Sequence, residues 1–432
     1  MKNVTCAFAL SCIVSAAFMG SISPAMAQTT QRARASWAGF VETNFPFFSS
    51  VLDARSLGPG WPTNNLTSRG LILNLGHDCW ACFDTDLLRV SAIWTGQAVT
   101  PVSMSQISYH SAGEKVPEGQ GKLPQIIGTP WLANGLYPGW QSGQSISLTD
   151  PREPGPDARE LGRGPISSTL GRFKSVRLTK DGACLEYEVA GSAVQEWISA
   201  RLEDERPLVQ RHFLVQPHEN TFWLMIGQSP TNSVERRHLS MTFPMIDGGH
   251  GATRFVQPNG LFTVQVPPAK VPVRFTATVS VGVAPKSPGS TNPVTTATPP
   301  VRWAPTLVST TALSASKEAY VLDNIPLPTN NPWQRNIRLA DTAFFHDGRA
   351  AAVTFDGDVW MISGLRGDLQ KVEWKRFTSG LHEPMGIAVR NQELFVFDRN
   401  GIWRLLDTDH NGEADVHELF SNAFVQTAET RE

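Results

Sequence analysis

The chain has 432 residues, with 37 basic side chains against 39 acidic ones and a formal net charge of −2. This balance excludes the strongly basic composition that is typical of nucleic-acid-binding proteins. Its 35 glycines and 31 prolines favour many short strands joined by turns over long helices. The length allows two to four domains.

Residues 1–27 have the pattern of a secretory signal peptide. Lys2 precedes an apolar stretch over residues 7–22, and Ala-Met-Ala at 25–27 provides a small-x-small cleavage site. The apolar stretch is interrupted by serine and glycine and is shorter than the ~20 residues of a membrane-spanning helix. No later segment is apolar enough to span a bilayer. We therefore expect an exported protein, periplasmic or extracellular, without a membrane span.

Residues 36–285 consist of strand-like runs separated by Gly, Pro, Asn and Asp. "GLILNL", "LLRVSAIW", "CLEYEVA" and "TFWLMIG" are examples, rich in β-branched and aromatic residues. Helical periodicity does not intervene between these runs. The pattern therefore predicts an all-β fold, with an antiparallel sandwich-like domain in this part of the chain.

Cys79 and Cys82 form a CxxC motif within this domain. Phe83 stands where covalent attachment of a c-type haem requires histidine, so we expect no c-type haem. A second cysteine pair for structural zinc is absent from the sequence. In an oxidising compartment the motif indicates either a short-range Cys79–Cys82 disulfide or two packed thiols.

Residues 111–171 are dense in glycine and proline and show almost no strand pattern, which predicts a long loop. Aromatic rings beside hydrogen-bonding charged groups are typical of sugar-binding surfaces. The loop therefore contains a candidate carbohydrate site, with the alternative that its aromatics pin the loop onto the sandwich. The candidate ligand-binding residues are Trp131, Tyr137, Trp140, Arg152 and Arg159.

A Pro/Ser/Thr-rich stretch at 286–305 predicts a linker, and an internal repeat follows it. "HDGRAAAVTFDGDVWMI" at 346–362 and "RNQELFVFDRNGIWRLL" at 390–406 share the order of turn, apolar strand, acidic residue, glycine and tryptophan. A period of ~40–50 residues is typical of β-propeller blades. Residues 306–432 are thus predicted to form an incomplete β-propeller of about two blades.

The stretch 377–415 resembles the propellers of secreted bacterial proteins related to soluble quinoprotein glucose and sorbosone dehydrogenases. The resemblance rests on a GL-x-x-P-x-G pattern before an inner strand and on the acidic turn after "IWRLL". Residues 36–285 look like an uncharacterised domain found ahead of such propellers. The resemblance implies a quinone-cofactor-dependent sugar or alcohol oxidoreductase.

The resemblance also implies about six blades in a complete propeller, whereas this chain supplies about two. We therefore expect a non-catalytic chain without a quinone cofactor, whose last strands have exposed edges. The alternative function is a carbohydrate- or surface-binding module that uses loop 111–171. Within the GL-x-x-P pattern, His382 and Glu383 are weak catalytic candidates. Adjacent side chains on a strand point apart, so the alternative is a solvated loop pair.

Residues 407–418 match the twelve-position calcium loop. Oxygen-bearing residues stand at positions 1, 3, 5, 7, 9 and 12, with Gly412 at the bend. The flanking residues are strand-like rather than helical, so the alternative is an Asx-stabilised turn. Either role is structural. The candidate calcium ligands are Asp407, Asp409, Asn411, Glu413 (through its carbonyl), Asp415 and Glu418.

Overall fold

The computed structural model describes residues 41–42, 44–104, 122–154, 163–230, 236–242, 251–286, 298–426 and 428. All of them belong to one compact unit, Ser36–Glu432. The predicted signal peptide, residues 1–27, lies outside the described residues. Within those residues, no helix has both the length and the apolarity needed to cross a membrane.

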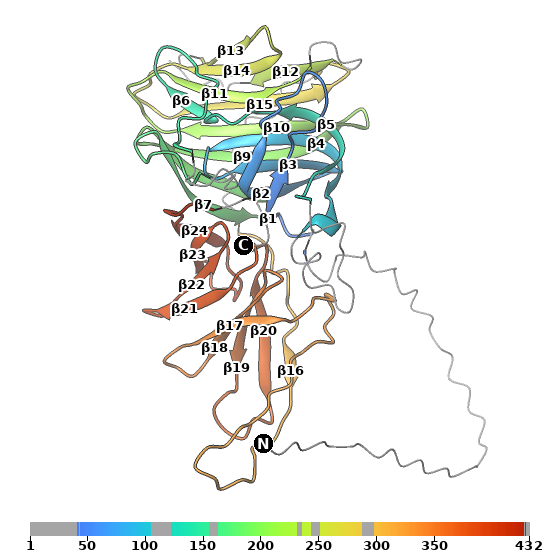
Figure 1. Ribbon diagram of the computed structural model, residues 1–432, viewed down its shortest axis with the longest axis vertical. Helices are drawn as coiled ribbons and strands as arrows, with labels where there is room; N and C mark the ends of the chain where they lie inside the picture. The colour runs from blue at the N-terminus through green and yellow to red at the C-terminus, as the bar shows by residue number, and fades with distance from the viewer. Residues whose placement is uncertain are drawn as a thin grey trace, which may run out of the picture. The chain divides into compact units, whose positions relative to one another are not determined.

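The all-β prediction is confirmed: the only helix among the described residues is the short 3₁₀ turn Pro101–Ser103. The first sheet has the strand order β1-β2-β3-β4-β5-β11-β14-β13, with β6 also paired to β11 (Figure 1). Its strands are β1 (Phe47–Asp53), β2 (Leu66–Gly76), β3 (Cys79–Asp84), β4 (Arg89–Val99), β5 (Ile126–Ala133), β6 (Trp140–Ser142), β11 (Phe222–Gln228), β13 (Thr253–Val256) and β14 (Leu261–Val266).

The second sheet has the order β12-β15-β10-β9-β8-β7-β24-β23-β22-β21 and is antiparallel throughout. Its strands are β7 (Gly171–Thr179), β8 (Gly182–Val189), β9 (Ser192–Glu203), β10 (Arg206–Val215), β12 (Arg237–Thr242), β15 (Val273–Val281), β21 (Gly386–Arg390), β22 (Glu393–Asp398), β23 (Gly401–Leu406) and β24 (Val416–Ser421).

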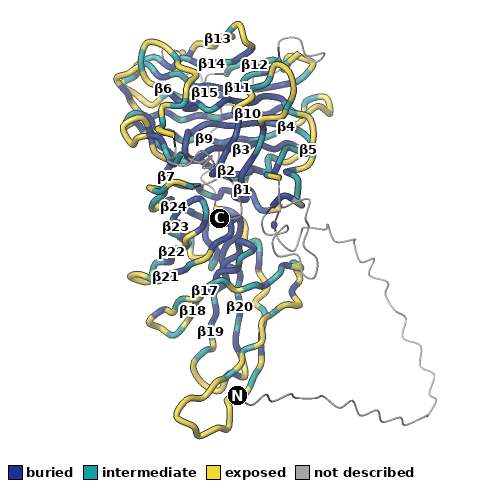
Figure 2. Tube along the Cα trace, viewed as in Figure 1, coloured by how far each residue is buried: buried dark blue, intermediate teal, exposed yellow. Residues whose placement is uncertain are grey.

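The two sheets form a sandwich because alternate side chains of their strands are apolar and meet in one core. Phe83 of β3 lies 5.7 Å from the ring of Phe173 in β7 and 5.6 Å from that of Tyr187 in β8. Figure 2 shows the buried residues along these strands and the exposed ones in the connecting turns. The two sheets thus form the predicted sandwich, and one of them continues into strands beyond residue 285.

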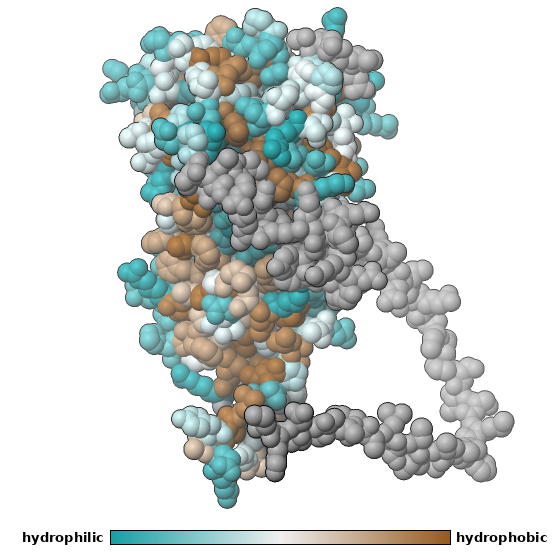
Figure 3. Space-filling model, viewed as in Figure 1, coloured by the Kyte–Doolittle hydropathy of each residue, from teal (hydrophilic) through white to brown (hydrophobic). Residues whose placement is uncertain are grey.

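The internal repeat corresponds to two four-stranded antiparallel meanders. The first meander, β17–β20, comprises β17 (Leu339–Phe344), β18 (Ala350–Thr354), β19 (Val359–Ser363) and β20 (Val372–Thr378), and β16 (Leu307–Ser309) pairs with β20. The second meander is β21–β24. Their first strands, β17 and β21, are neighbours. Figure 3 shows many apolar residues over this part of the chain.

The second meander is continuous with the sandwich. β24 pairs with β7, with Val416 opposite Arg177 and Glu418 opposite Ser175. Trp403 of β23 also packs edge-on against Phe173, with ring centroids 6.4 Å apart. The prediction that the last strands have exposed edges is therefore wrong for β24. We call the β7–β24 pairing, with the side chains of Phe173, Trp403 and His417 beside it, the seam.

The end of the predicted linker packs against Phe45, which precedes β1, and against Glu413 of the second meander. Residues 287–297 lie outside the described ranges, but Trp303 is buried and stacks on Phe45 at 5.6 Å. The Glu413 carboxylate accepts hydrogen bonds from the backbone N–H groups of Arg302 and Trp303. This end of the stretch is consequently fixed in place rather than solvated.

The predicted long loop 111–171 contains regular structure. Residues 126–133 and 140–142 form β5 and β6, while 105–121 and 155–162 lie outside the described residues. Glycine and proline conceal β5 in the sequence. The register of its ladder with β4 shifts twice, and Pro130 stands beside one of these shifts. Gly128 has φ +138°, a conformation that favours glycine.

We predict that Trp403→Ala lowers the free energy of unfolding by about 3–5 kcal/mol, as is typical for truncation of a buried aromatic side chain. Because Trp403 packs across the seam, the sandwich and the second meander should unfold in one urea transition, measured by circular dichroism and by tryptophan fluorescence. Tyr320→Ala, at a side chain that is 94% exposed, is the control and should cost less than about 0.5 kcal/mol. Two separate transitions in the wild type would contradict the shared core.

Candidate functional site

His382 and Glu383 are both buried, which rules out a solvated loop pair. Burial, aided by the positive charge of Arg399, lowers the pKa of His382 to about 3, so the imidazole is neutral at pH 7. Burial raises the pKa of Glu383, although its ion pair with Arg399 at 3.3 Å opposes this shift. The two residues are neighbours in sequence, but among the hydrogen bonds of the described residues none joins one to the other.

Asp398 fixes the turn that holds this loop. Its carboxylate accepts hydrogen bonds from the backbone N–H groups of His382, Asn400 and Gly401 and from the Trp403 indole. Burial raises the pKa of Asp398 to about 6, against these four hydrogen bonds, which favour the carboxylate. The Asp398 carboxylate is buried and therefore holds the loop in place from inside the protein.

A buried charge cluster, which the sequence pattern did not reveal, lies beside this loop. Arg376 is fully buried; it pairs with Asp358 at 3.0 Å and with Glu42. Asp358 also pairs with Arg335 at 2.7 Å. Burial by itself would raise the pKa of Asp358, but Arg335 and Arg376 outweigh it and hold the pKa below its usual value. The Arg376 guanidinium lies 4.1 Å from the centroid of the Trp303 ring, an additional cation–π contact.

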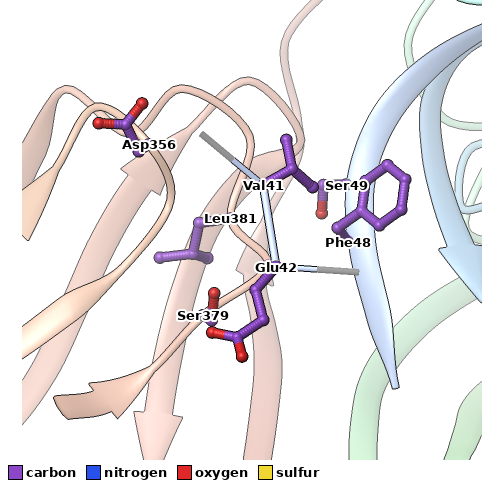
Figure 4. Close-up of a pocket in the computed structure, with 8 residues that line it drawn as sticks. Val41, Glu42, Phe48, Ser49, Asp356, Ser379 and Leu381 are labelled. Carbon is purple, nitrogen blue, oxygen red and sulfur yellow. The ribbon is translucent and has the colours of Figure 1, made fainter. Parts of the chain in front are cut away.

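A small hollow adjoins this cluster (Figure 4). It has room for about one water molecule. The Ser49 hydroxyl in its wall is buried and has no hydrogen-bond partner among the described residues, so a single water would satisfy it. A sugar or a quinone needs several hundred Å³. The hollow is lined by Val41, Glu42, Phe48, Ser49, Asp356, Ser379, Gly380 and Leu381.

Three of the predicted calcium ligands converge. Oxygen atoms of Asp407, Asp409 and Asp415 lie within 4.8 Å of one another. Asn411 and Gly412 donate backbone hydrogen bonds to the Asp407 carboxylate, at 3.0 and 2.8 Å. These bonds are those of the alternative, an Asx-stabilised turn.

Glu418, by contrast, does not reach this cluster. The prediction that Glu418 closes the loop is wrong, because its side chain projects from β24 and pairs with Arg404 at 2.5 Å. The Glu413 carboxylate is committed to residues 302 and 303, although its carbonyl was the predicted ligand. The Lys375 ammonium, from the first meander, donates to the Asn411 carbonyl at 2.8 Å. The loop thus offers three carboxylates beside a built-in cation, which fits only weak calcium binding.

The aromatic residues of the predicted carbohydrate site lie in the core. Trp131, Tyr137 and Trp140 are 2–4% exposed, so they form no platform for a sugar, and that prediction is wrong for these three. The Trp140 indole donates to the Tyr187 hydroxyl at 2.9 Å, and Tyr187 donates in turn to Glu196. The residues pin this segment to the sandwich, which was the alternative.

Of the two arginines predicted for that site, the structure describes Arg152 but not Arg159. The Arg152 guanidinium is bonded to the Asp150 carboxylate and to the Gly164 carbonyl. It therefore holds the chain on either side of residues 155–162. Arg159 lies within that stretch, outside the described residues.

Cys79 and Cys82 are free thiols, so the predicted disulfide is wrong and the packed-thiol alternative holds. They stand three apart on β3, and side chains at an odd spacing point to opposite faces of a strand. Cys79 accordingly lies in the sandwich core, whereas Cys82 lies in a second cluster on the other face of the sheet. Burial raises the pKa of each thiol to about 12, so neither is a reactive thiolate at neutral pH.

His417 of β24 is also buried, and the sequence pattern did not single it out. Its Nε2 lies 2.6 Å from the Thr378 hydroxyl, and the Phe47 ring packs edge-on against it at 5.2 Å. Burial lowers the pKa of His417 to about 3. In the folded protein its imidazole therefore stays neutral at pH values well below the ordinary pKa of histidine. In the unfolded chain the same imidazole is already protonated there.

Comparison with known proteins identifies one domain. Residues 81–196, which begin in β3 and end in β9, match a domain of unknown function, DUF6797. This match agrees with the expectation of an uncharacterised domain within residues 36–285. No curated protein and no solved structure matches the chain.

The pKa of His417 leads to a prediction about pH. Between pH 3 and 6.5 the unfolded chain binds a proton that folded His417 does not, so stability falls as the pH drops below 6.5. His417→Gln should reduce the loss of unfolding free energy between pH 7 and pH 5 by about 2 kcal/mol. Urea titrations at both pH values measure this, since the other titrating groups are common to both proteins.

Thr378→Val is the matched control for His417→Gln. It removes the hydroxyl partner but keeps the histidine, so it should lower stability similarly at both pH values. An unaltered pH dependence in His417→Gln would show that His417 does not remain neutral in the folded state.

Proposed function

We propose that this chain is an exported β-protein in which a DUF6797-containing sandwich carries a pair of propeller-like meanders as a non-catalytic scaffold. One observation carries the proposal: the two acid–base candidates of the segment that resembles sugar and alcohol dehydrogenases, His382 and Glu383, are buried. His382 and Glu383 are 3% and 8% exposed, and Asp358 and Arg376 are fully buried.

This burial supports a structural role because a general base must come within hydrogen-bonding distance of the proton that it removes. The His382 side chain is buried, and its backbone N–H donates a hydrogen bond to the Asp398 carboxylate. The hollow on this side of the loop has room for about one water molecule. Neither a sugar nor a quinone cofactor fits there.

We also propose a weak structural calcium site at Asp407, Asp409 and Asp415. Their converging oxygens suit a hard cation. The neighbouring Lys375 ammonium supplies positive charge to the same loop and so competes with the ion. A bound ion would stabilise the turn between β23 and β24, and with it the strand that pairs with the sandwich.

The non-catalytic role predicts no turnover in a dye-linked oxidation assay with glucose and with simple alcohols, after addition of quinone cofactor and calcium chloride. The reason is that no acid–base group of the loop reaches a substrate. Turnover above the rate without protein would contradict the proposal. If turnover does appear, its loss in His382→Gln would place the reaction at this loop.

Calcium should raise the free energy of unfolding of the wild type by about 1.4 kcal/mol at 10 mM, as expected for a dissociation constant near 10⁻³ M. Lys375→Gln removes the competing charge and should increase this stabilisation. The Asp407→Asn/Asp409→Asn double variant should abolish it. Thermal unfolding with calcium and with equal ionic strength of sodium chloride measures the difference. Equal responses of all three proteins would rule out the site.

A further inference from the structure

The connection between β16 and β17 is the longest segment without strand or helix among residues 298–426. It covers residues 310–338, whereas the strands from β17 to β24 are joined by shorter turns. Connections longer than about 12–15 residues are uncommon inside compact domains and are often functional. Residues 312–322 of this connection are all exposed (Figure 2). We call residues 310–326 the 310–326 loop.

Both ends of the 310–326 loop are fixed to the first meander. The Ser309 hydroxyl donates a hydrogen bond to the Pro326 carbonyl at 2.5 Å, which holds the two ends together. The Thr311 N–H donates to the Leu369 carbonyl at 3.1 Å. Beyond the loop, Trp333 packs against the core of the first meander. The loop therefore projects from an ordered base, and a change at its tip leaves this base in place.

The backbone at the tip of the loop has little internal hydrogen bonding. The Ser314 N–H donates to the Asp323 carboxylate at 2.7 Å. The N–H groups of Ser316 and Glu318 each donate to the hydroxyl of the serine two residues before, at 3.2 Å. Among the hydrogen bonds of the described residues, none involves residues 319–322. The N–H and C=O groups of these four residues are therefore available to pair with another protein's backbone, as in strand addition.

This unpaired stretch carries two very exposed apolar side chains. Tyr320 and Leu322 are 94% and 81% exposed, the highest values for large apolar residues in the described part of the chain. Phe344 of β17 follows at 68%, but its backbone pairs with Ala350 in the β17–β18 ladder. A large apolar side chain on an unpaired backbone suits the S1 pocket of a chymotrypsin-type endopeptidase, which binds the residue before the scissile bond.

We propose that the 310–326 loop is a cleavage site for an endopeptidase whose S1 pocket takes an aromatic or leucine side chain, and that the cut chain stays folded. The scissile bonds are Tyr320–Val321 and Leu322–Asp323. Hydrolysis adds one water molecule across the peptide bond. It leaves a carboxylate on the residue before the bond and an amino group on the residue after it. This site extends beyond the proposed scaffold role and does not depend on it.

The two products of the cut are joined by strand pairing and by buried side chains. β16, which precedes the loop, pairs with β20, which follows it, with Leu307 opposite Trp374. β7 pairs with β24 at the seam. Trp303 also lies against the Arg376 guanidinium, at 4.1 Å. Because these contacts cross from one product to the other, we expect a two-chain protein with an unchanged core rather than release of the two meanders.

Limited digestion of the native chain with chymotrypsin tests the site, and mass spectrometry of the new termini locates each cut. Cleavage after Tyr320 or Leu322 should be at least about tenfold faster than after Phe344, whose strand must first open. Tyr320→Ser/Leu322→Ser should abolish cleavage at both bonds. Leu313→Ser, at a 52% exposed residue of the same loop, is the matched control and should be cut like the wild type. An uncut loop in the wild type overturns the proposal, as do equal rates after Tyr320 and Phe344.

Gel filtration of the cut wild type tests whether the products stay together, and it needs no variant. In native buffer the two products should elute together at the volume of the uncut chain, and in concentrated urea they should separate. The far-ultraviolet circular dichroism of the cut protein should equal that of the uncut protein. Separate elution in native buffer, or loss of the β-sheet spectrum on cleavage, would overturn the proposal that the cut chain stays folded.

Discussion

The antiparallel pairing of β7 with β24 is the constraint on which the rest of the structure depends. It makes the second meander an extension of the sandwich sheet, so one apolar core runs from the sandwich into both meanders. It also brings Trp403 against Phe173 and encloses His417 among Thr378, Phe45 and Phe47. The buried charges around Arg376 then tie the first meander to the chain that precedes β1.

The elements of the fold could be predicted from local patterns, because strands and turns depend on residues close in sequence. The repeat around Trp360 and Trp403 correctly gave two similar meanders. The seam could not be predicted in this way: it is formed by backbone donors and acceptors, which are the same for every residue type. β5 was missed because Gly128 and Pro130 suggested a loop, although the bulged ladder with β4 accommodates both.

The candidate sites illustrate the same limit. The Asp407–Asp415 turn was predictable because its carboxylates are brought together by a few residues of chain. Glu418 lies beyond the start of β24, where the alternation of the strand sends it to Arg404 instead. For Trp131 and Trp140 the residue types suggested a sugar surface, but residue type does not determine burial. Lys375 is 36 residues from Asn411, and only the packing of the two meanders brings it to the loop.

The positions of Cys79 and Cys82 on opposite faces of β3 have a consequence for biogenesis. Since both are free thiols in the folded protein, the fold of this domain does not depend on a cross-link between them. The vulnerable species is the unfolded chain, whose thiols are unshielded and have ordinary acidity. Rapid closure of the sandwich is thus its protection against aberrant pairing of cysteines in an oxidising environment.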